Sequence, residues 1–357
     1  MVKKVLICPL DWGLGHATRC VPIVWELQKR GVEILIASSG NALHFLRQEF
    51  PTLSFFELPG YNPEYPTQTS MSFKMMAQLP KFIGVVNKEH EQTKKIVQDR
   101  NIDIVIADNR YGCWSSQARS IFIAHQVDLL MPSGFGWVAP IINSIGHRYI
   151  RNFHEVWIPD QPGSGLTTPF VTSKTQNQKY IGWLSRFQKR GAVAFKYEII
   201  ALVSGPEPQR TVFENLLTRE LKASGLNSLL VAGKPNEPFH KQEGCVEVVN
   251  HLATRDLEDA ILSARMVISR SGYSTVMDLI TLNKKAVFVP TPGQTEQEYL
   301  AKELKKNKVA YAVSQNEFKL FEALNESTNY TGFSNWERTP DLLTAAVENS
   351  LSPTPKT

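Results

Sequence analysis

The chain has 357 residues, more than one hydrophobic core ordinarily organises, so we expect two domains. Hydrophobic residues make up 42% of the chain and charged residues 20%, a globular balance that excludes a disordered protein. The net charge of +5 favours acidic ligands, such as nucleotide diphosphates, or an anionic membrane surface, while the lack of dense basic blocks argues against a nucleic-acid binder.

The first half of the chain alternates short apolar runs with helical patterns. Strands are predicted at 5–9, 32–37, 53–58, 102–107 and 121–124, and helices at 18–30, 42–49, 70–100 and 134–156. Continuous β-branched runs of this kind are typical of parallel strands that are covered by helices on both faces. The pattern therefore predicts an N-terminal Rossmann-like domain over residues 1–160.

A proline- and glycine-rich stretch without periodicity follows, and we place an interdomain linker at residues 161–180. A second α/β series comes next, with strands at 197–203, 228–232, 246–249, 266–269 and 286–290 and helices at 211–223, 256–263, 274–281 and 296–306. It predicts a second Rossmann-like domain over residues 181–338. Residues 339–357 form a helix and a proline-rich tail, and we expect this helix to pack on the N-terminal domain.

The turn after the first strand, Gly13-Leu14-Gly15-His16, opens the first helix at the carboxyl edge of the sheet. Its glycines let backbone amides approach a ligand closely, and a helix N-terminus favours negative charge. His16 titrates near neutral pH and is a candidate base for an incoming hydroxyl. Asp108 follows a later strand at the same edge and could orient His16 or assist it. The alternatives are a histidine that only caps the helix and an aspartate that caps a loop.

The turn that follows the strand at 197–203 runs from Ser204 to Arg210. Ser204 and Gly205 offer hydroxyl and N–H donors, and the planar guanidinium of Arg210 suits phosphate oxygens. The alternative is a tight, proline-shaped connector with Arg210 in solvent.

A third turn, at 269–275, sets small hydroxyls around one glycine at a helix start, which is typical of an anion site. Asp278 lies one turn into that helix, where its carboxylate can accept both hydroxyls of a ribose. In the alternative interpretation, Ser274 caps the helix and the negative charge of Asp278 compensates the helix dipole. The candidate ligands of a nucleotide-sugar are Arg270, Ser271, Gly272, Tyr273, Ser274 and Asp278.

A fourth turn follows the strand at 286–290 and opens a helix with an acid–amide cluster. Gln294, Glu296 and Gln297 offer the mixed donors and acceptors that sugar hydroxyls require, although Glu296 also fits a simple first-turn acid. The sequence has no Asp-x-Asp pair to chelate a metal–diphosphate, and we predict no metal site. Arg210 and helix N-termini would then neutralise a diphosphate.

Together these turns resemble those of the family-28 glycosyltransferases, the group that includes the lipid-II-forming GlcNAc transferase. The resemblance covers residues 2–304 and is carried by Gly13–His16, Ser204–Pro206, Gln209–Arg210, Arg270–Asp278 and Pro290–Gln297. It implies two facing Rossmann-like domains, the GT-B architecture. It also implies inverting, metal-independent transfer from a UDP-sugar co-substrate to an acceptor hydroxyl of a glycan or a lipid-linked molecule, with no further cofactor.

The resemblance also implies roles for single residues. His16 would be the base, Asp278 would bind the ribose in place of the family's usual glutamate, and Gln294, Glu296 and Gln297 would bind the sugar. The remaining nucleotide-sugar ligands would be Gly13, Gly15, Ser204, Gly205, Gln209, Arg210, Arg270, Ser271, Gly272, Tyr273 and Ser274.

The first turn departs from this family because it lacks one glycine and continues into Arg19 and Cys20. The pattern Gly-x-Gly-His-x-x-Arg-Cys also resembles enzymes that hydrolyse UDP-sugars in nonulosonic acid biosynthesis. A UDP-sugar hydrolase or epimerase therefore stays an alternative, as does a non-catalytic nucleotide-sugar binding protein.

Location is indicated only weakly. The four cysteines are scattered without paired spacing, which predicts reduced thiols in the cytoplasm. No apolar stretch approaches the length of about 20 residues that spans a membrane, so we expect a soluble protein. The Met-rich helical region at 71–82 could contact lipid at the inner membrane face, although a Met-rich core face is the commoner explanation of such a pattern. Trp137, His147, Arg148 and Arg151 permit the same peripheral contact.

Overall fold

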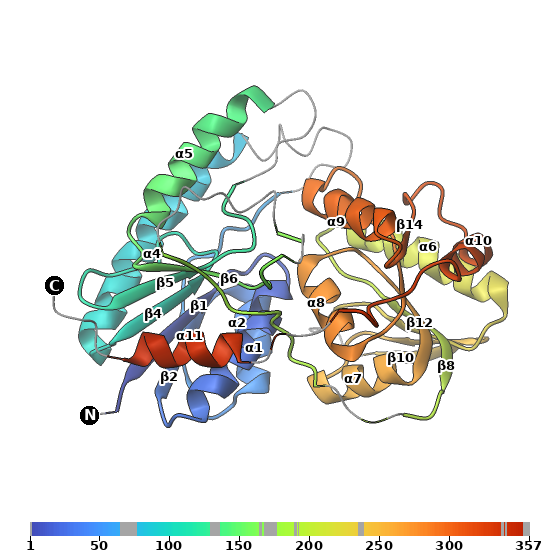
Figure 1. Cartoon of the computed structure of the whole chain (residues 1–357), viewed down its shortest axis with the longest axis horizontal. Coiled ribbons are helices and arrows are strands. Elements are labelled where there is room, and N and C mark those ends of the chain that lie inside the picture. Colours follow the sequence, from blue (N-terminus) through green and yellow to red (C-terminus); the bar gives the residue numbers. More distant parts are fainter. Residues whose placement is uncertain are drawn as a thin grey trace. The chain divides into compact units, whose positions relative to one another are not determined.

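The computed structural model describes residues 2–64, 77–128, 136–163, 166–167, 177–188, 191, 193–234, 239–336, 339 and 341–352. These residues form two compact units. The N-terminal unit holds residues 2–64, 77–184 and 339–352, and the C-terminal unit holds residues 185–336. Each unit is an α/β layer structure built on its own sheet (Figure 1).

The N-terminal unit contains a seven-stranded sheet in the order β3-β2-β1-β4-β5-β6-β7, and every strand pair in it is parallel. The strands are β1 (Lys4–Pro9), β2 (Glu33–Ser38), β3 (Ser54–Glu57), β4 (Ile104–Asp108), β5 (Arg119–Ile123), β6 (Glu155–Ile158) and β7 (Gln178–Tyr180). The central strands β1, β4 and β5 are buried apart from the first residues of β1 and β5, as their apolar runs predict. Because the strands are parallel, the residues that follow β1, β4 and β5 meet at one edge of the sheet.

The helices of this unit are α1 (Gly15–Gln28), α2 (Gly40–Glu49), α4 (Leu79–Arg100), the 3-10 turn η1 (Gly136–Val138), α5 (Ala139–Ile150) and α11 (Leu342–Leu351). Helix α11, from the end of the chain, lies along α1 (Figure 1). Thr344 of α11 donates a hydrogen bond of 2.8 Å to Glu26 of α1, and Arg30 pairs with Glu348 at 2.7 Å. The expected packing of the C-terminal helix on the N-terminal domain is confirmed.

The helix expected at 134–156 ends earlier, at Ile150, and the sequence interpretation was wrong beyond that point. His154 donates its backbone N–H to the carbonyl of Ser120, and β6 then joins the sheet beside β5. Trp157 and Ile158 are fully buried there, which a strand at this position requires. The first part of the helix expected at 70–100 lies outside the described residues, and α4 begins at Leu79.

The segment expected as a linker, 161–180, contributes β7 to the N-terminal sheet, and the unit continues to Leu184. The buried carboxylate of Asp160 secures it. Asp160 accepts hydrogen bonds from the backbone N–H of Gln161, from Thr167, and from the indole of Trp183 at 2.9 Å. The chain therefore leaves the N-terminal unit later than its proline and glycine content indicates.

The C-terminal unit contains a second seven-stranded sheet, in the order β10-β11-β9-β8-β12-β13-β14. Only β10 and β11 are antiparallel in it. Its elements are β8 (Tyr197–Leu202), α6 (Gln209–Ser224), β9 (Ser228–Val231), β10 (His240–Glu243), β11 (Val246–Val249), α7 (Thr254–Leu262), β12 (Ala264–Ser269), α8 (Tyr273–Leu282), β13 (Ala286–Phe288), α9 (Thr295–Lys306), β14 (Tyr311–Ala312) and α10 (Leu320–Ser327). The turns after β8, β12 and β13 share one edge, as predicted.

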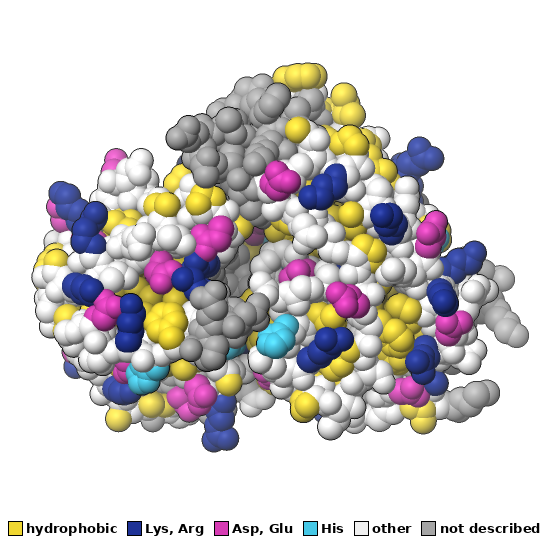
Figure 2. Space-filling model, turned by 180° about the vertical axis from the view of Figure 1, so that it is seen from behind, with side chains coloured by type: hydrophobic (Ala, Val, Ile, Leu, Met, Phe, Trp, Pro, Cys, Tyr) yellow, Lys and Arg dark blue, Asp and Glu magenta, His cyan; other side chains and the backbone are white. Residues whose placement is uncertain are grey.

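Two further observations concern the surface. No described helix is long and apolar enough to cross a membrane. On the side shown in Figure 2, basic and acidic side chains are interspersed rather than gathered by sign.

Candidate active site

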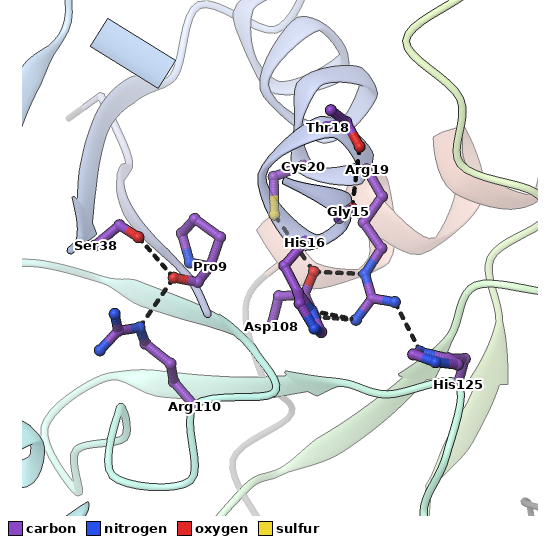
Figure 3. Close-up of polar contacts among 10 residues, drawn as sticks. All are labelled: Pro9, Gly15, His16, Thr18, Arg19, Cys20, Ser38, Asp108, Arg110 and His125. Carbon is purple, nitrogen blue, oxygen red and sulfur yellow. Dashed lines mark hydrogen bonds and ion pairs between the residues drawn. The ribbon is translucent and has the colours of Figure 1, made fainter. Parts of the chain in front are cut away.

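His16 and Asp108 come together at the carboxyl edge of the N-terminal sheet. His16 lies in the first turn of α1, just after β1, and Asp108 ends the neighbouring strand β4, opposite Pro9. The imidazole Nδ1 of His16 lies 3.0 Å from Oδ1 of Asp108 (Figure 3). The structure thus joins the two residues that the sequence singled out as catalytic, and their roles stay predictions.

Arg19 completes this cluster, and sequence reasoning missed it. It lies one helical turn after His16, on the same face of α1. Its Nε donates to Oδ2 of Asp108 at 2.6 Å, its Nη2 donates to Oδ1, and its Nη1 donates to Nδ1 of His125 at 2.7 Å. His125 follows β5, so three strand ends supply the cluster. The spacing His-x-x-Arg at a helix start was the only signal of it in the sequence.

The charges in the cluster favour an ionised Asp108 and a neutral His16. Burial alone would raise the pKa of Asp108, but the charge of Arg19 and the hydrogen bonds from Arg19 and His16 outweigh it and hold that pKa well below its usual range. Burial, followed by the charge of Arg19, lowers the pKa of His16. Burial and the charge of Asp108 raise the pKa of the Cys20 thiol, whose Sγ donates to Oδ2 of Asp108 at 3.7 Å.

A second buried ion pair supports the strand end beneath this cluster. Arg110 and Glu89 are fully buried and paired with each other. Arg110 also donates to the carbonyl of Pro9 at 2.9 Å and to the hydroxyl of Ser39 at 2.6 Å. The pair ties α4 to the end of β1 and to the residue after β2.

In the C-terminal unit, the turn after β8 exposes Ser204 and Gly205, and Gly205 adopts a left-handed φ of +108° that favours glycine. Arg210 differs from our expectation. Its guanidinium is paired with Glu207 and with Glu214 at 2.8 Å, so two carboxylates already balance its charge. The guanidinium of Arg210 is therefore already engaged within the protein, and it is not the open phosphate-binding group that the sequence indicated.

Arg270 is likewise turned inward. It is 1% exposed, lies over the ring of Phe213, and donates to the carbonyls of Val289 and Pro290 at 3.0 Å each and to Gln315 at 2.6 Å. Burial lowers its pKa to about 9. The side chain therefore holds the fourth turn in place, and a direct contact of Arg270 with a ligand is not supported.

The turn after β12 retains the features of an anion site at a helix start. Helix α8 begins at Tyr273, with Gly272 as its N-cap, and Ser274 lies half-buried in the first turn. The ring of Tyr273 is buried and packs in the core. Ser271 donates its hydroxyl to the carbonyl of Gln297 at 2.8 Å, which links this turn to the next one.

Asp278 lies half-buried on α8. Burial raises the pKa of its carboxyl to about 6, against the opposing effects of Arg186 and Ser185. Ser185 donates a hydrogen bond of 2.5 Å to Oδ1 of Asp278. A carboxylate with one oxygen already bonded can still accept from ribose hydroxyls.

The fourth turn is internally bonded. The side-chain oxygen of Gln294 accepts the backbone N–H of Gln297 and caps α9, and that of Gln297 accepts the N–H of Thr291 at 2.9 Å. Both amide groups thus have their oxygen turned inward, which leaves their nitrogens as donors for sugar oxygens. Glu296 lies partly exposed in the same turn.

Two buried amides at this edge lack partners. Within the described part of the chain, both polar atoms of the Asn250 side chain, after β11, and Oε1 of Gln209, at the start of α6, make no hydrogen bond. Such atoms cost about 1–3 kcal/mol each unless a ligand or water satisfies them. Sequence reasoning included Gln209 and missed Asn250, because a single asparagine after a strand gives no pattern.

The comparisons with known proteins agree with this architecture. Residues 219–334 match the Glycosyltransferase family 28 C-terminal domain. An uncharacterized glycosyltransferase of Methanosarcina mazei is 22% identical over 328 residues, 83% of this chain and 81% of that protein. A UDP-N-acetylglucosamine–N-acetylmuramyl-(pentapeptide) pyrophosphoryl-undecaprenol N-acetylglucosamine transferase of Haemophilus ducreyi is 24% identical over 312 residues, 84% of this chain and 81% of that protein.

Solved structures show the same fold. Acinetobacter baumannii MurG matches with a TM-score of 0.58 and 15% identity, over 97% of this chain and 98% of that one. The spinosyn rhamnosyltransferase SpnG matches with a TM-score of 0.64 and 13% identity, over 98% and 96%. The fold is that of the GT-B glycosyltransferases. The C-terminal unit carries a glycosyltransferase family 28 domain, and the chain is a glycosyltransferase.

Proposed function

We propose that this glycosyltransferase moves a sugar from a UDP-sugar to an acceptor hydroxyl, with inversion at the anomeric carbon and without a metal. The observation that carries the proposal is the imidazole of His16, held against the ionised carboxylate of Asp108 at the start of α1. The uridine donor is supported by the name of the Haemophilus ducreyi relative, which includes UDP-N-acetylglucosamine.

In this proposal His16 accepts the proton of the acceptor hydroxyl while its oxygen attacks the anomeric carbon. The bond from that carbon to the diphosphate breaks on the opposite face, and UDP leaves as an anion. The N-termini of α6 and α8 favour the negative charge that develops on it. Asp278 and the Gln294 and Gln297 amides bind the ribose and the sugar.

We propose a lipid-linked acceptor, taken up at a membrane surface. Trp137, Ile141 and Ile145 are 72%, 59% and 41% exposed and lie at four-residue spacing, so they share one face of η1 and α5. Arg148, exposed one turn further along, suits anionic headgroups. An apolar stripe with a basic end is typical of a helix that lies in the membrane interface.

Hydrolysis of the UDP-sugar is a second candidate. Arg19 and Cys20 are the residues by which the first turn resembles UDP-sugar hydrolases, and both of them contact Asp108. Water would then take the place of the acceptor hydroxyl. Release of free sugar at the full turnover rate with no acceptor present would favour hydrolysis, and formation of an epimer would favour an epimerase. Tight binding without turnover under any acceptor would indicate a binding protein.

The test begins with thermal stability against UDP, TDP, GDP and their sugar conjugates in EDTA. Ligand at about a hundred times its dissociation constant adds roughly 2.7 kcal/mol of stability. TDP belongs in the panel because a solved structural neighbour, SpnG, is complexed with thymidine diphosphate. A selective shift with UDP compounds supports the donor, and no shift with any nucleotide would overturn it. Turnover of the best conjugate, with the anomeric configuration of the product read by NMR, then tests inversion.

A further inference from the structure

Arg19 holds both oxygens of the carboxylate beside the proposed base. Its Nε donates to Oδ2 of Asp108 at 2.6 Å, and its Nη2 donates to Oδ1. This is the bidentate geometry that a guanidinium favours with a carboxylate. Arg19 is 1% exposed and Asp108 is fully buried, so water does not compete for the pair (Figure 3).

Without Arg19, His16 and Asp108 would form an ion pair of their own. A buried carboxylate 3.0 Å from an imidazole nitrogen stabilises the imidazolium form. An imidazolium carries no lone pair on nitrogen and cannot accept the proton of an incoming hydroxyl. A histidine in that state would be inactive as a base at neutral pH.

We propose that Arg19 is a positioning residue that keeps His16 a neutral imidazole by pairing with the carboxylate of Asp108. The inference rests on the proposed role of His16 as the base. The charged and titratable groups of this cluster are Arg19 and Cys20 from α1, Asp108 from β4, and His125 after β5. Among these described groups, the positive charge comes from Arg19, whose guanidinium donates a hydrogen bond to His125.

A second contact works in the same direction. Nη2 of Arg19 lies 2.8 Å from Nδ1 of His16. The guanidinium charge is therefore close enough to the imidazole that protonation of His16 would set two cations against each other. Burial and the charge of Arg19 lower the pKa of His16, and the opposing effect of Asp108 is smaller.

The experiment is an NMR titration of histidine Cε1 in the full chain, with the His16 signal assigned by its loss in His16→Gln. In Arg19→Met we expect the pKa of His16 to rise by at least one pH unit, because Asp108 then pairs with the imidazole alone. Adding Asp108→Asn to Arg19→Met should reverse most of this rise. Arg30→Met, which removes an arginine just beyond the C-terminal end of α1 and away from the cluster, is the matched control and should leave the His16 titration unchanged. An unchanged pKa in Arg19→Met would overturn the inference.

A second variant covers the case in which Arg19→Met does not fold. Asp108→Asn alone keeps the arginine and removes the carboxylate, so the pKa of His16 should fall below its wild-type value. A rise in that variant would contradict the proposed charge balance.

Kinetics separate this inference from the proposed function. In Arg19→Met the acidic limb of kcat/KM should move to higher pH by the same interval as the His16 titration, so that below both pKa values activity falls about tenfold for each unit of the shift. A merely structural role would lower activity at every pH without moving the limb. If the titration shifts but no variant transfers sugar, the inference stands and the proposed function fails. If sugar is transferred and neither the titration nor the limb moves, the inference alone fails.

Discussion

The hydroxyl of Ser185 donates a hydrogen bond of 2.5 Å to Asp278, and so joins the first residue of the C-terminal unit to helix α8. Ser185 in turn accepts the backbone N–H of Phe187 at 3.0 Å. The carboxyl of Asp278 accepts this hydrogen bond in a desolvated position, and burial raises its pKa to about 6 against the opposing effects of Arg186 and Ser185. Its charge therefore changes within a pH range that is easily reached in a binding experiment.

We predict that UDP affinity falls as the pH drops below about 6. Only the ionised carboxylate of Asp278 accepts both ribose hydroxyls, and at pH 5 about one-tenth of a group with a pKa near 6 is ionised. The apparent dissociation constant should therefore be about tenfold higher at pH 5 than at pH 7.5. Isothermal titration calorimetry across this range measures it.

The terminal phosphate of UDP also titrates near pH 6, so a control is needed. Asp278→Asn should bind UDP weakly at every pH and retain only the dependence that the phosphate contributes. A variant with wild-type affinity at pH 7.5 would remove Asp278 from the ribose site.

Much of the fold followed from apolar runs, because central parallel strands are buried on both faces. β1 and β4 are of this type. β6 is not, since its first residue is Glu155, a buried carboxylate balanced by Arg119 and Lys179. From the sequence alone, a charged residue with a buried ion-pair partner cannot be distinguished from a charged residue on the exposed face of a helix. The helix predicted at 134–156 therefore extended past Ile150.

The candidate site was predictable where residues follow strands and unpredictable where they depend on side-chain direction. His16 and Asp108 both follow parallel strands, so the topology brings them to one edge. Arg19 lies inside a helix, where a charged residue is ordinarily exposed, and only the buried carboxylate explains its position. Arg210 was assigned to phosphate by its charge and Arg270 to the nucleotide-sugar by its place in the third turn, whereas the structure gives both of them internal partners.

The buried pair of Glu89 and Arg110 should contribute strongly to the stability of the N-terminal unit. Glu89→Gln leaves the buried charge of Arg110 without a counter-ion, and we expect a loss of about 3–5 kcal/mol. Hydrogen exchange of the amides in β1 and β4 measures the change within that unit. Glu348→Gln is the matched control, because Glu348 is 61% exposed and its pair with Arg30 should be worth less than about 1 kcal/mol. Equal losses in the two variants would contradict the prediction.

Membrane binding should depend on the apolar stripe of η1 and α5. Replacing Trp137 and Ile141 with glutamate should weaken binding to vesicles of anionic phospholipid at least tenfold, since burying each side chain contributes about 1.5–3 kcal/mol. Co-sedimentation measures the binding. Phe321→Glu alters an equally exposed hydrophobic residue of the C-terminal unit and should leave vesicle binding unchanged. Wild-type binding by the double variant would exclude this surface.

His16→Gln should lower kcat by about 10²–10⁴, because positioned general bases contribute a factor of that size. The dissociation constant of the UDP-sugar should stay within about twofold of the wild-type value, since Asp278, Gln294 and Gln297, which we propose to bind the ribose and the sugar, lie in the C-terminal unit. Single-turnover kinetics and calorimetry measure the two quantities separately. His44→Gln, which changes an exposed histidine of α2 in the same unit, controls for a general effect of the substitution and should retain full activity. A His16→Gln enzyme with near-wild-type kcat would remove His16 as the base. A loss of donor affinity equal to the loss of rate would instead assign His16 to substrate binding.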